Sequence, residues 1–287
     1  MDTFVAWARA HELKLRGHTM IWGEALPTWF GGLDRAAAVR AVENHIADIG
    51  RHLAGRIHSW DVVNEAIKPN DGRPDRLRRT ELVEKIGPEF LDIAFRAARA
   101  ADPKAKLVYN DFDFELDVPE QRDKRRTLLD LLDGFRKRGT PIDAVGLQSH
   151  LSLEDMPRFN EKAYGDFLRE VAARGVEIMI TELDVIDRAA PGGIAKRDAA
   201  VAATYKRFLD VALAEKAVKT VVVWGLCDRN SWIDWMNPRT KRVDAASAAF
   251  AVRRGIPAKA GLHHGCGGAR RRTSAVKNRR SRHFRPR

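Results

Sequence analysis

Two glutamates follow short apolar runs and are the residues of this sequence best suited to acid–base chemistry. Glu65 ends the segment Ser-Trp-Asp-Val-Val-Asn-Glu (59–65), and Glu182 ends Glu-Ile-Met-Ile-Thr-Glu (177–182). Such runs are typical of buried parallel strands whose last side chains emerge at the C-terminal edge of a sheet. Two carboxyl groups there predict glycoside hydrolysis, in which one protonates the leaving oxygen and the other attacks the anomeric carbon or activates water. The alternative is a pair of solvated strand-end glutamates, which spacing alone does not exclude.

The elements that must position these glutamates alternate between strand-like and helix-like patterns. Strands are predicted at 13–21, 57–63, 105–110, 144–148, 176–181 and 218–226. Amphipathic helices are predicted between them, at roughly 34–53, 88–101, 119–138, 160–174 and 197–216. This alternation predicts an α/β fold with a parallel sheet, either doubly wound or closed into a (β/α)8 barrel. No glycine-rich phosphate loop follows the first strand, which favours the barrel.

The positive charge of the chain is confined to its C-terminal end. The formal net charge is +12, but residues 253–287 hold twelve Lys and Arg and no Asp or Glu, which leaves 51 − 12 = 39 basic against 39 acidic side chains elsewhere. A neutral body gives no electrostatic argument for specific nucleic-acid binding by the folded part. A hydrophobic content of 44% in 287 residues is enough for a large core, so a wholly disordered chain is excluded.

The remaining composition excludes several other classes of site. Cys227 and Cys266 are too few for a disulfide framework and lack metal-ligand spacing. No apolar run approaches about 18 residues, so we expect no membrane span. The first residues have neither a basic segment nor a long apolar core, so they do not read as a signal peptide.

The predicted strand ends form a series when they are read together. In order they are Arg-Gly-His-Thr-Met-Ile-Trp (16–22), Trp-Asp-Val-Val-Asn-Glu (60–65), Tyr-Asn-Asp-Phe (109–112), Gly-Leu-Gln-Ser-His-Leu (146–151), Ile-Thr-Glu-Leu-Asp (180–184) and Val-Trp-Gly-Leu-Cys-Asp (223–228). Over about residues 4–236 this series resembles the endo-β-1,4-xylanases of glycoside hydrolase family 10, from their third barrel strand to their eighth. The resemblance implies a retaining hydrolase of xylan or xylo-oligosaccharides, which works as a monomer without metal or cofactor.

The resemblance also implies roles for individual residues. Glu65 matches the acid/base and Glu182 the nucleophile, and a retaining enzyme holds these carboxyl groups about 5–5.5 Å apart. Asn64 matches the asparagine that bonds the sugar 2-hydroxyl. His150 matches a histidine that orients the nucleophile, with Asp184 behind it. The implied substrate contacts are Gln148, His18 and Trp22, together with Trp224 and Trp232 as aromatic walls.

The sequence departs from the family pattern at several places. Gly23 stands where many members have a histidine, and Phe112 where a tyrosine is common. Two βα units that precede the third strand, on the order of 60 residues, have no counterpart, so we expect a barrel without its first two βα units. After Trp235 the closing family segment is also missing, and an Ala-rich helix is predicted at 243–254.

We therefore expect a partial barrel domain at residues 1–252 and a basic, disordered tail at 253–287. The tail is interpreted as an out-of-frame or disordered extension rather than as a specific nucleic-acid-binding segment. An intact parent enzyme is expected to be secreted or periplasmic. Three other readings stay open: a catalytically impaired barrel remnant, a hydrolase of related β-1,4-glucans, and a basic nucleic-acid-binding protein, which only residues 253–287 support.

Overall fold

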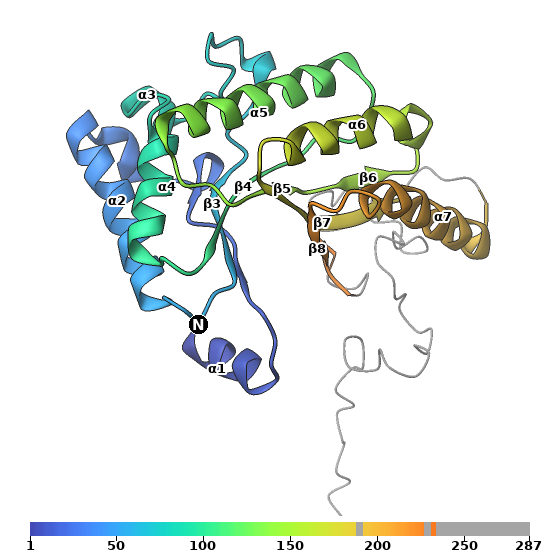
Figure 1. Ribbon diagram of the computed structural model, residues 1–287, viewed down its shortest axis with the longest axis horizontal. Coiled ribbons are helices and arrows are strands. Elements are labelled where there is room, and N and C mark those ends of the chain that lie inside the picture. Colours follow the sequence, from blue (N-terminus) through green and yellow to red (C-terminus); the bar gives the residue numbers. More distant parts are fainter. Residues whose placement is uncertain (188–191, 227–230, 234–287) are drawn as a thin grey trace, which may run out of the picture.

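A parallel sheet forms the centre of the molecule (Figure 1). The computed structural model describes residues 1–187, 192–226 and 231–233. Within these residues the strands are β1 (Arg16–Gly17), β2 (Ile21–Trp22), β3 (Ser59–Asn64), β4 (Lys106–Asp111), β5 (Ala144–Leu147), β6 (His150–Ser152), β7 (Glu177–Ile186) and β8 (Val218–Val223). β1, β3, β4, β5 and β7 follow one another across the sheet, while β2 lies beside β3, and β6 and β8 lie beside β7. All of these strand pairs are parallel.

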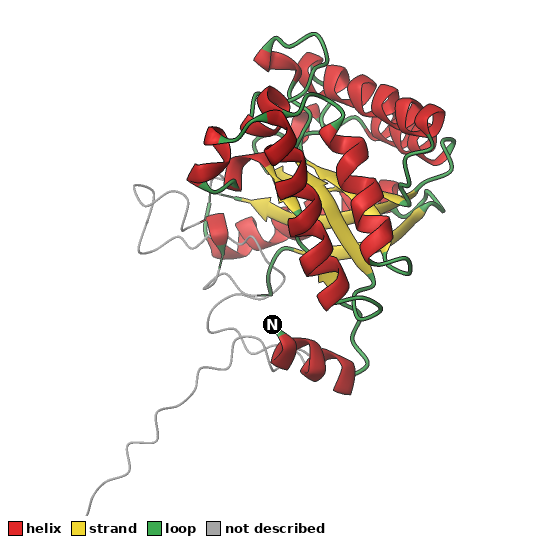
Figure 2. Cartoon of the chain, turned by 90° about the vertical axis from the view of Figure 1, so that its left-hand side faces the viewer, coloured by secondary structure: helices red, strands yellow, loops and turns green. Residues whose placement is uncertain are grey.

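Helices connect the strands and cover the outside of the sheet (Figure 2). They are α1 (Asp2–Ala10), α2 (Arg35–His52), α3 (Glu81–Lys85), α4 (Phe90–Ala101), α5 (Pro119–Arg138), α6 (Glu161–Ala172) and α7 (Ile194–Ala212). Four short 3-10 turns complete the described elements: η1 (Gly23–Ala25), η2 (Thr28–Gly32), η3 (Pro69–Asp71) and η4 (Met156–Arg158). Two neighbouring parallel strands start at the same edge of the sheet, so the chain must cross back between them, and the longer helices make most of these connections.

The two strands that lead to the glutamates are buried, as their apolar runs predict. All six residues of β3 are buried, and so is β7 except at its two ends. Burial on both faces requires helices outside the sheet and a packed interior, which is the arrangement of parallel α/β folds. The strand order along the sheet therefore brings the ends of β3, β4, β5 and β7 together.

The predicted strand 13–21 is wrong as a continuous element, because it is divided into β1 and β2. Gly17 pairs with Trp60, and the next pair is Ile21 with Val63. Between these pairs the first segment advances by four residues while β3 advances by three. The extra residue interrupts the ladder, and the intervening turn bonds back to the β3 backbone. One consequence is that Trp22 belongs to a strand beside Asn64.

The predicted end of the strand 176–181 is also wrong, since β7 continues to Ile186. Beyond Thr181 it gains a new neighbour, β6, which pairs His150 with Asp184. β6 follows β5 after Ser149, whose φ of 62° turns the chain. Glu182 therefore lies inside a strand and not at its tip.

The predicted helices are confirmed as α2, α4, α5, α6 and α7, with end points that move by a few residues. α1 and α3 were not predicted, because nine and five residues give too little helical periodicity to read. α1 lies at the opposite end of the molecule from α5 and α6 (Figure 1).

The sheet is open between β1 and β8 in the described part of the chain. β1 pairs with β3 alone, and β8 with β7 alone. Residues from both ends of the sheet, including Arg16 and Lys219, line a cavity of about 600 Å³. Val221 on β8 is 38% exposed, which contrasts with the burial of β3. The predicted helix at 243–254, Trp235, both cysteines and the tail 253–287 lie outside the described residues.

Candidate active site

Glu65 follows β3 directly, and four groups hold it in place. Its backbone N–H donates to the carbonyl of Asn110 at 2.8 Å. Its carboxyl Oε1 accepts from Nε2 of Gln148 at 2.9 Å, and Oε2 accepts from Nε1 of Trp22 at 3.0 Å. Arg78 lies on the other side, with Nη2 3.9 Å from Oε2. The side chain is 14% exposed, so this carboxyl group is sheltered but still reaches the surface.

Glu182 is more deeply buried, with 6% of its side chain exposed. Oε1 accepts a hydrogen bond from Nδ2 of Asn110 at 2.9 Å, and Oε2 lies 3.3 Å from Nε2 of His150. Its backbone N–H donates to the carbonyl of Gln148 at 3.0 Å, which ties β7 to the end of β5. Asn110 and Gln148 therefore each contact both glutamates, one through a backbone carbonyl and the other through a side-chain amide.

Asn110, at the end of β4, joins the two glutamate environments. Its Nδ2 donates to Oδ1 of Asn64 and to Oε1 of Glu182, both at 2.9 Å. Its Oδ1 accepts from the hydroxyl of Thr181 at 2.7 Å, which fixes the orientation of the amide. Gly146 makes this possible, because a Cβ there would lie 2.3 Å from that oxygen. Sequence reasoning treated Asn110 only as part of a strand end, and its central position was missed.

Asn64 and Gln148 are buried beside the glutamates. Asn64 is 2% exposed, and its Oδ1 accepts from Asn110 and, at 3.4 Å, from Gln148. Both of these bonds use the amide oxygen of Asn64, so its NH₂ group is the part that can donate to a ligand. Gln148 was predicted as a substrate contact, and the structure places its amide against Glu65.

His150 lies between two carboxylates, as the sequence predicts. Its Nδ1 is 2.9 Å from Oδ1 of Asp184, and its other ring nitrogen faces Glu182. Burial by itself lowers the pKa of His150, but the hydrogen bonds and charges of Asp184 and Glu182 outweigh burial and raise the pKa to about 10. A positively charged His150 compensates two buried carboxylates at once. Trp232 completes this cluster, since its indole donates to Oδ2 of Asp184 at 2.7 Å and its ring packs on His150.

His18 belongs to a separate ion cluster at the start of the sheet. Its Nδ1 lies 2.9 Å from Oδ2 of the fully buried Asp61, which also pairs with Arg16. Burial lowers the pKa of His18, but the hydrogen bond and charge of Asp61, helped by Glu182, raise the pKa above its ordinary value. The ring of His18 meets the edge of Trp224 with centroids 5.8 Å apart. The structure therefore brings His18 and Trp224 together, and Trp232 lies with His150.

The two departures from the family pattern lie around Arg78. Gly23 packs closely, since a Cβ on it would lie 2.5 Å from Cγ2 of Thr80. The ring of Phe112 receives Nζ of Lys124 at 3.9 Å and the guanidinium of Arg78 at 5.6 Å from its centroid. A phenyl ring in place of a phenol thus contacts two cations and donates no hydrogen bond.

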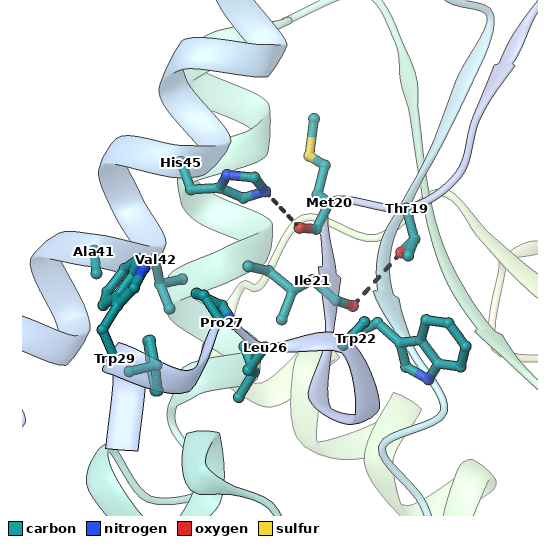
Figure 3. A pocket seen from close by; sticks show the side chains of 12 residues that line it. Thr19, Met20, Ile21, Trp22, Leu26, Pro27, Trp29, Ala41, Val42 and His45 are labelled. Atoms are coloured by element: carbon teal, nitrogen blue, oxygen red, sulfur yellow. Dashed lines mark hydrogen bonds between the residues drawn. The ribbon is translucent and has the colours of Figure 1, made fainter. Parts of the chain in front are cut away.

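An apolar pocket of about 270 Å³ lies between α2 and residues 19–30, and Trp22 is among the residues that line it (Figure 3). Trp29 lies beside Ala41 and Val42, and His45 donates to the carbonyl of Met20 at 3.0 Å. None of the residues that line this pocket is a carboxylate. In the part of the chain that the structure describes, no cluster of His, Cys, Asp and Glu could hold a metal ion. Likewise, no described helix has the length and hydropathy to cross a membrane.

Comparison with curated proteins finds similar xylanases. Endo-1,4-beta-xylanase B of Neocallimastix patriciarum is 34% identical over 222 residues, which cover 77% of this chain and 24% of that protein. Endo-1,4-beta-xylanase A of Thermotoga neapolitana is 34% identical over 269 residues, or 88% of this chain and 24% of that protein. The chain therefore spans about a quarter of the length of these relatives.

Solved structures give the same family and fold. Xylanase 10B from Thermotoga petrophila RKU-1 in complex with xylobiose matches with a TM-score of 0.76 and 27% identity, over 88% of this chain and 72% of that one. GH10 from Paenibacillus barcinonensis matches with a TM-score of 0.76 and 29% identity, over 90% and 77%. A model of the Glycosyl hydrolase family 10 matches residues 1–249. The predicted family is thereby confirmed: the chain belongs to glycosyl hydrolase family 10, and its curled parallel sheet with outer helices corresponds to part of a (β/α)8 barrel.

Proposed function

We propose that this protein is an endo-1,4-β-xylanase that uses Glu65 and Glu182 in a retaining double displacement. One observation carries the assignment of these residues. Glu65 and Glu182 belong to a single hydrogen-bonded network that runs from Glu65 through Gln148, Asn64 and Asn110 to Glu182. Such a network holds two carboxyl groups in different environments on one side of the sheet, which is what a two-carboxylate mechanism requires.

In the first step Glu65 acts as the acid. It gives its proton to the glycosidic oxygen, the aglycone sugar leaves, and a carboxylate oxygen of Glu182 bonds to the anomeric carbon. Glu182 suits the role of nucleophile, because it is buried between Asn110 and His150, which lie against its two carboxyl oxygens. Glu65 suits the role of acid and base, because its carboxyl group is the more exposed of the two, 14% against 6%, and water must reach it in the second step.

In the second step Glu65 acts as the base. It takes a proton from water, the water oxygen bonds to the anomeric carbon, and the bond from that carbon to Glu182 breaks. The NH₂ group of Asn64 is placed to donate to the sugar 2-hydroxyl, an interaction that strengthens as positive charge develops on the ring. His18, Trp22, Trp224 and Trp232 are proposed to contact the sugar. Xylo-oligosaccharide as the ligand is supported by the xylobiose in the complex of the Thermotoga petrophila relative.

Two substitutions test the roles. Glu182→Ala should abolish hydrolysis of every substrate, while Glu65→Ala should lose activity on xylan and keep the first step with aryl xylobiosides that have good leaving groups. Equal losses on both substrate classes would contradict the assignment. Proton NMR of the first product should show the retained anomer, and the carboxyl separation of about 5–5.5 Å stays a prediction.

A second candidate function is a barrel that binds xylo-oligosaccharides with little turnover. It is favoured by the outer edges of β1 and β8, which have no strand partner within the described residues. An unpaired edge admits water beside the site and weakens the preorganised electrostatics. The full chain should then melt broadly and hydrolyse xylan poorly. A sharp transition together with ordinary turnover would refute this candidate.

A further inference from the structure

The loop that follows Glu65 turns back toward it. After β3 the chain passes through η3 and returns antiparallel, so that Ile67 pairs with Leu77. The backbone N–H of Arg78 then donates to the carbonyl of Ala66 at 2.7 Å. Although Arg78 is thirteen residues away in sequence, its side chain reaches Glu65.

The guanidinium of Arg78 is buried and, besides the ring of Phe112, has three polar neighbours. Nε donates to the backbone carbonyl of Glu65 at 2.8 Å, and Nη1 donates to Oε1 of Glu24 at 3.2 Å. Nη2 lies 3.9 Å from Oε2 of Glu65, and it has no hydrogen-bond partner among the described residues. Only 9% of the side chain is exposed. A buried guanidinium N–H without a hydrogen-bond partner is costly, so the position of Nη2 beside Glu65 indicates a functional role.

The hydrogen bond from Nε of Arg78 holds one end of the Glu65 backbone, which has an unusual conformation. Its φ is 57°, the left-handed region that a residue with a Cβ rarely adopts. Asn110 accepts the N–H on one side of Glu65, and Arg78 binds the carbonyl on the other. Both peptide groups are therefore fixed, which sets the direction in which the carboxyl group leaves the chain.

The charge of Arg78 is placed to act on the carboxyl group. Among the ion pairs of the described residues, Arg78 is the cationic partner of Glu65. The other charged groups near Arg78 include Glu24, on Nη1, Lys124, which shares the ring of Phe112, and Asp71. Glu182 and His150 lie at the far end of the network. A small cavity of about 10 Å³ is lined by Gly23, Glu65 and Arg78 together with their neighbours.

We propose that Arg78 is a positioning residue for the acid/base step: it fixes the backbone of Glu65 and compensates the negative charge that Glu65 gains on protonating the leaving oxygen. The identity of that step rests on the proposed function. A cation close to a forming carboxylate stabilises the product of proton transfer more than the reactant.

Leaving-group dependence in the full chain tests the proposal. Rates are measured for aryl β-xylobiosides with a dinitrophenol and with a phenol leaving group, because only the phenol needs strong acid catalysis. In Arg78→Gln the phenyl substrate should slow by about tenfold or more, and the dinitrophenyl substrate by less than about threefold. Arg79→Gln is the matched control, since Arg79 is the next residue, is 59% exposed and should behave as wild type. Equal losses on both substrates, or no loss, would overturn the proposal.

A second readout does not depend on turnover. The indole N–H of Trp22 donates to Glu65, so its NMR signal, identified by its loss in Trp22→Phe, reports the ionisation of that carboxyl group. In Arg78→Gln the midpoint should move to higher pH than in wild type and Arg79→Gln, while Arg78→Lys, which keeps the charge, should stay near wild type. An unchanged midpoint in Arg78→Gln would refute the charge role. If wild type hydrolyses neither substrate, the proposed function fails, and this titration still decides the role of Arg78.

Discussion

The indole Nε1–H of Trp22 donates a hydrogen bond of 3.0 Å to Oε2 of Glu65. Trp22 was expected to contact sugar, and the structure connects it to the carboxyl group itself. In the proposed mechanism, one face of this side chain contacts the sugar while its polar edge orients the carboxyl group of Glu65. The bond exists because Trp22 lies beside Asn64 in the sheet, after the extra residue that separates β1 from β2.

Trp22→Phe should lower kcat on xylan by about tenfold, because a hydrogen bond to a carboxylate of roughly 1.5 kcal/mol is lost during proton transfer. The effect on KM should be smaller, since a phenyl ring still packs against sugar. Initial rates over a range of xylan concentrations separate the two constants. Trp7→Phe, a change on the half-exposed face of α1, is the control and should leave both constants unchanged.

Asn110→Ala should be the most damaging change outside the two glutamates. It removes donors to Asn64 and Glu182 and leaves the hydroxyl of Thr181 without its acceptor. We expect the free energy of unfolding to fall by about 1–3 kcal/mol and kcat to fall at least tenfold, as estimates for a buried group left unpaired. Urea unfolding and xylan hydrolysis measure the two effects. Wild-type kcat in this variant would show that the network has no catalytic role; Asn70→Ala, on η3, is the surface control.

His150 predicts a pH dependence of stability. Its pKa in the folded protein, about 10, lies above the ordinary value of 6.5, so the folded state holds the proton more tightly than the unfolded state. This contribution to stability is complete below pH 6.5 and is lost as the pH rises toward 10.

Urea unfolding of wild type and His150→Gln should therefore differ most below pH 6.5, and the difference should shrink toward pH 10. A difference that stays constant over this interval would contradict the paired, protonated histidine. The exposed His52, changed to Gln, serves as the surface control.

Deletion of residues 253–287 should leave the melting temperature and xylan hydrolysis unchanged. This prediction rests on composition, since the twelve basic residues of the segment are balanced by no acidic ones, whereas the rest of the chain is neutral. Any salt-dependent retention on DNA-cellulose should disappear with the deletion. A lower melting temperature would show instead that the segment contributes to the fold.

The order of strands and longer helices could be predicted, because apolar periodicity is a local property of the chain. The motifs then pointed to Glu65, Glu182 and His150 as site residues, and the structure brings these side chains together through one network. Their catalytic roles stay predictions. Asn110 and Arg78 could not be identified in this way. Asn110 gains its importance from Glu182, 72 residues away, and Arg78 from a loop that turns back on itself. An asparagine at a strand end and an arginine in a loop look the same in sequence whether they face solvent or a carboxylate.

The position of β8 at the edge of the sheet has a consequence for the order in which the molecule loses structure on heating. Among the described residues β8 has one neighbouring strand, whereas β3, β4 and β5, which lead to Glu65, Asn110 and Gln148, each lie between others. Local opening starts where backbone bonds are fewest, so the segment with Trp224 should detach while the glutamates are still in place. Amides of β8 should then exchange with deuterium before those of β4. On the proposed role of Trp224 in sugar binding, mild warming should inactivate the protein below the temperature at which its helices melt.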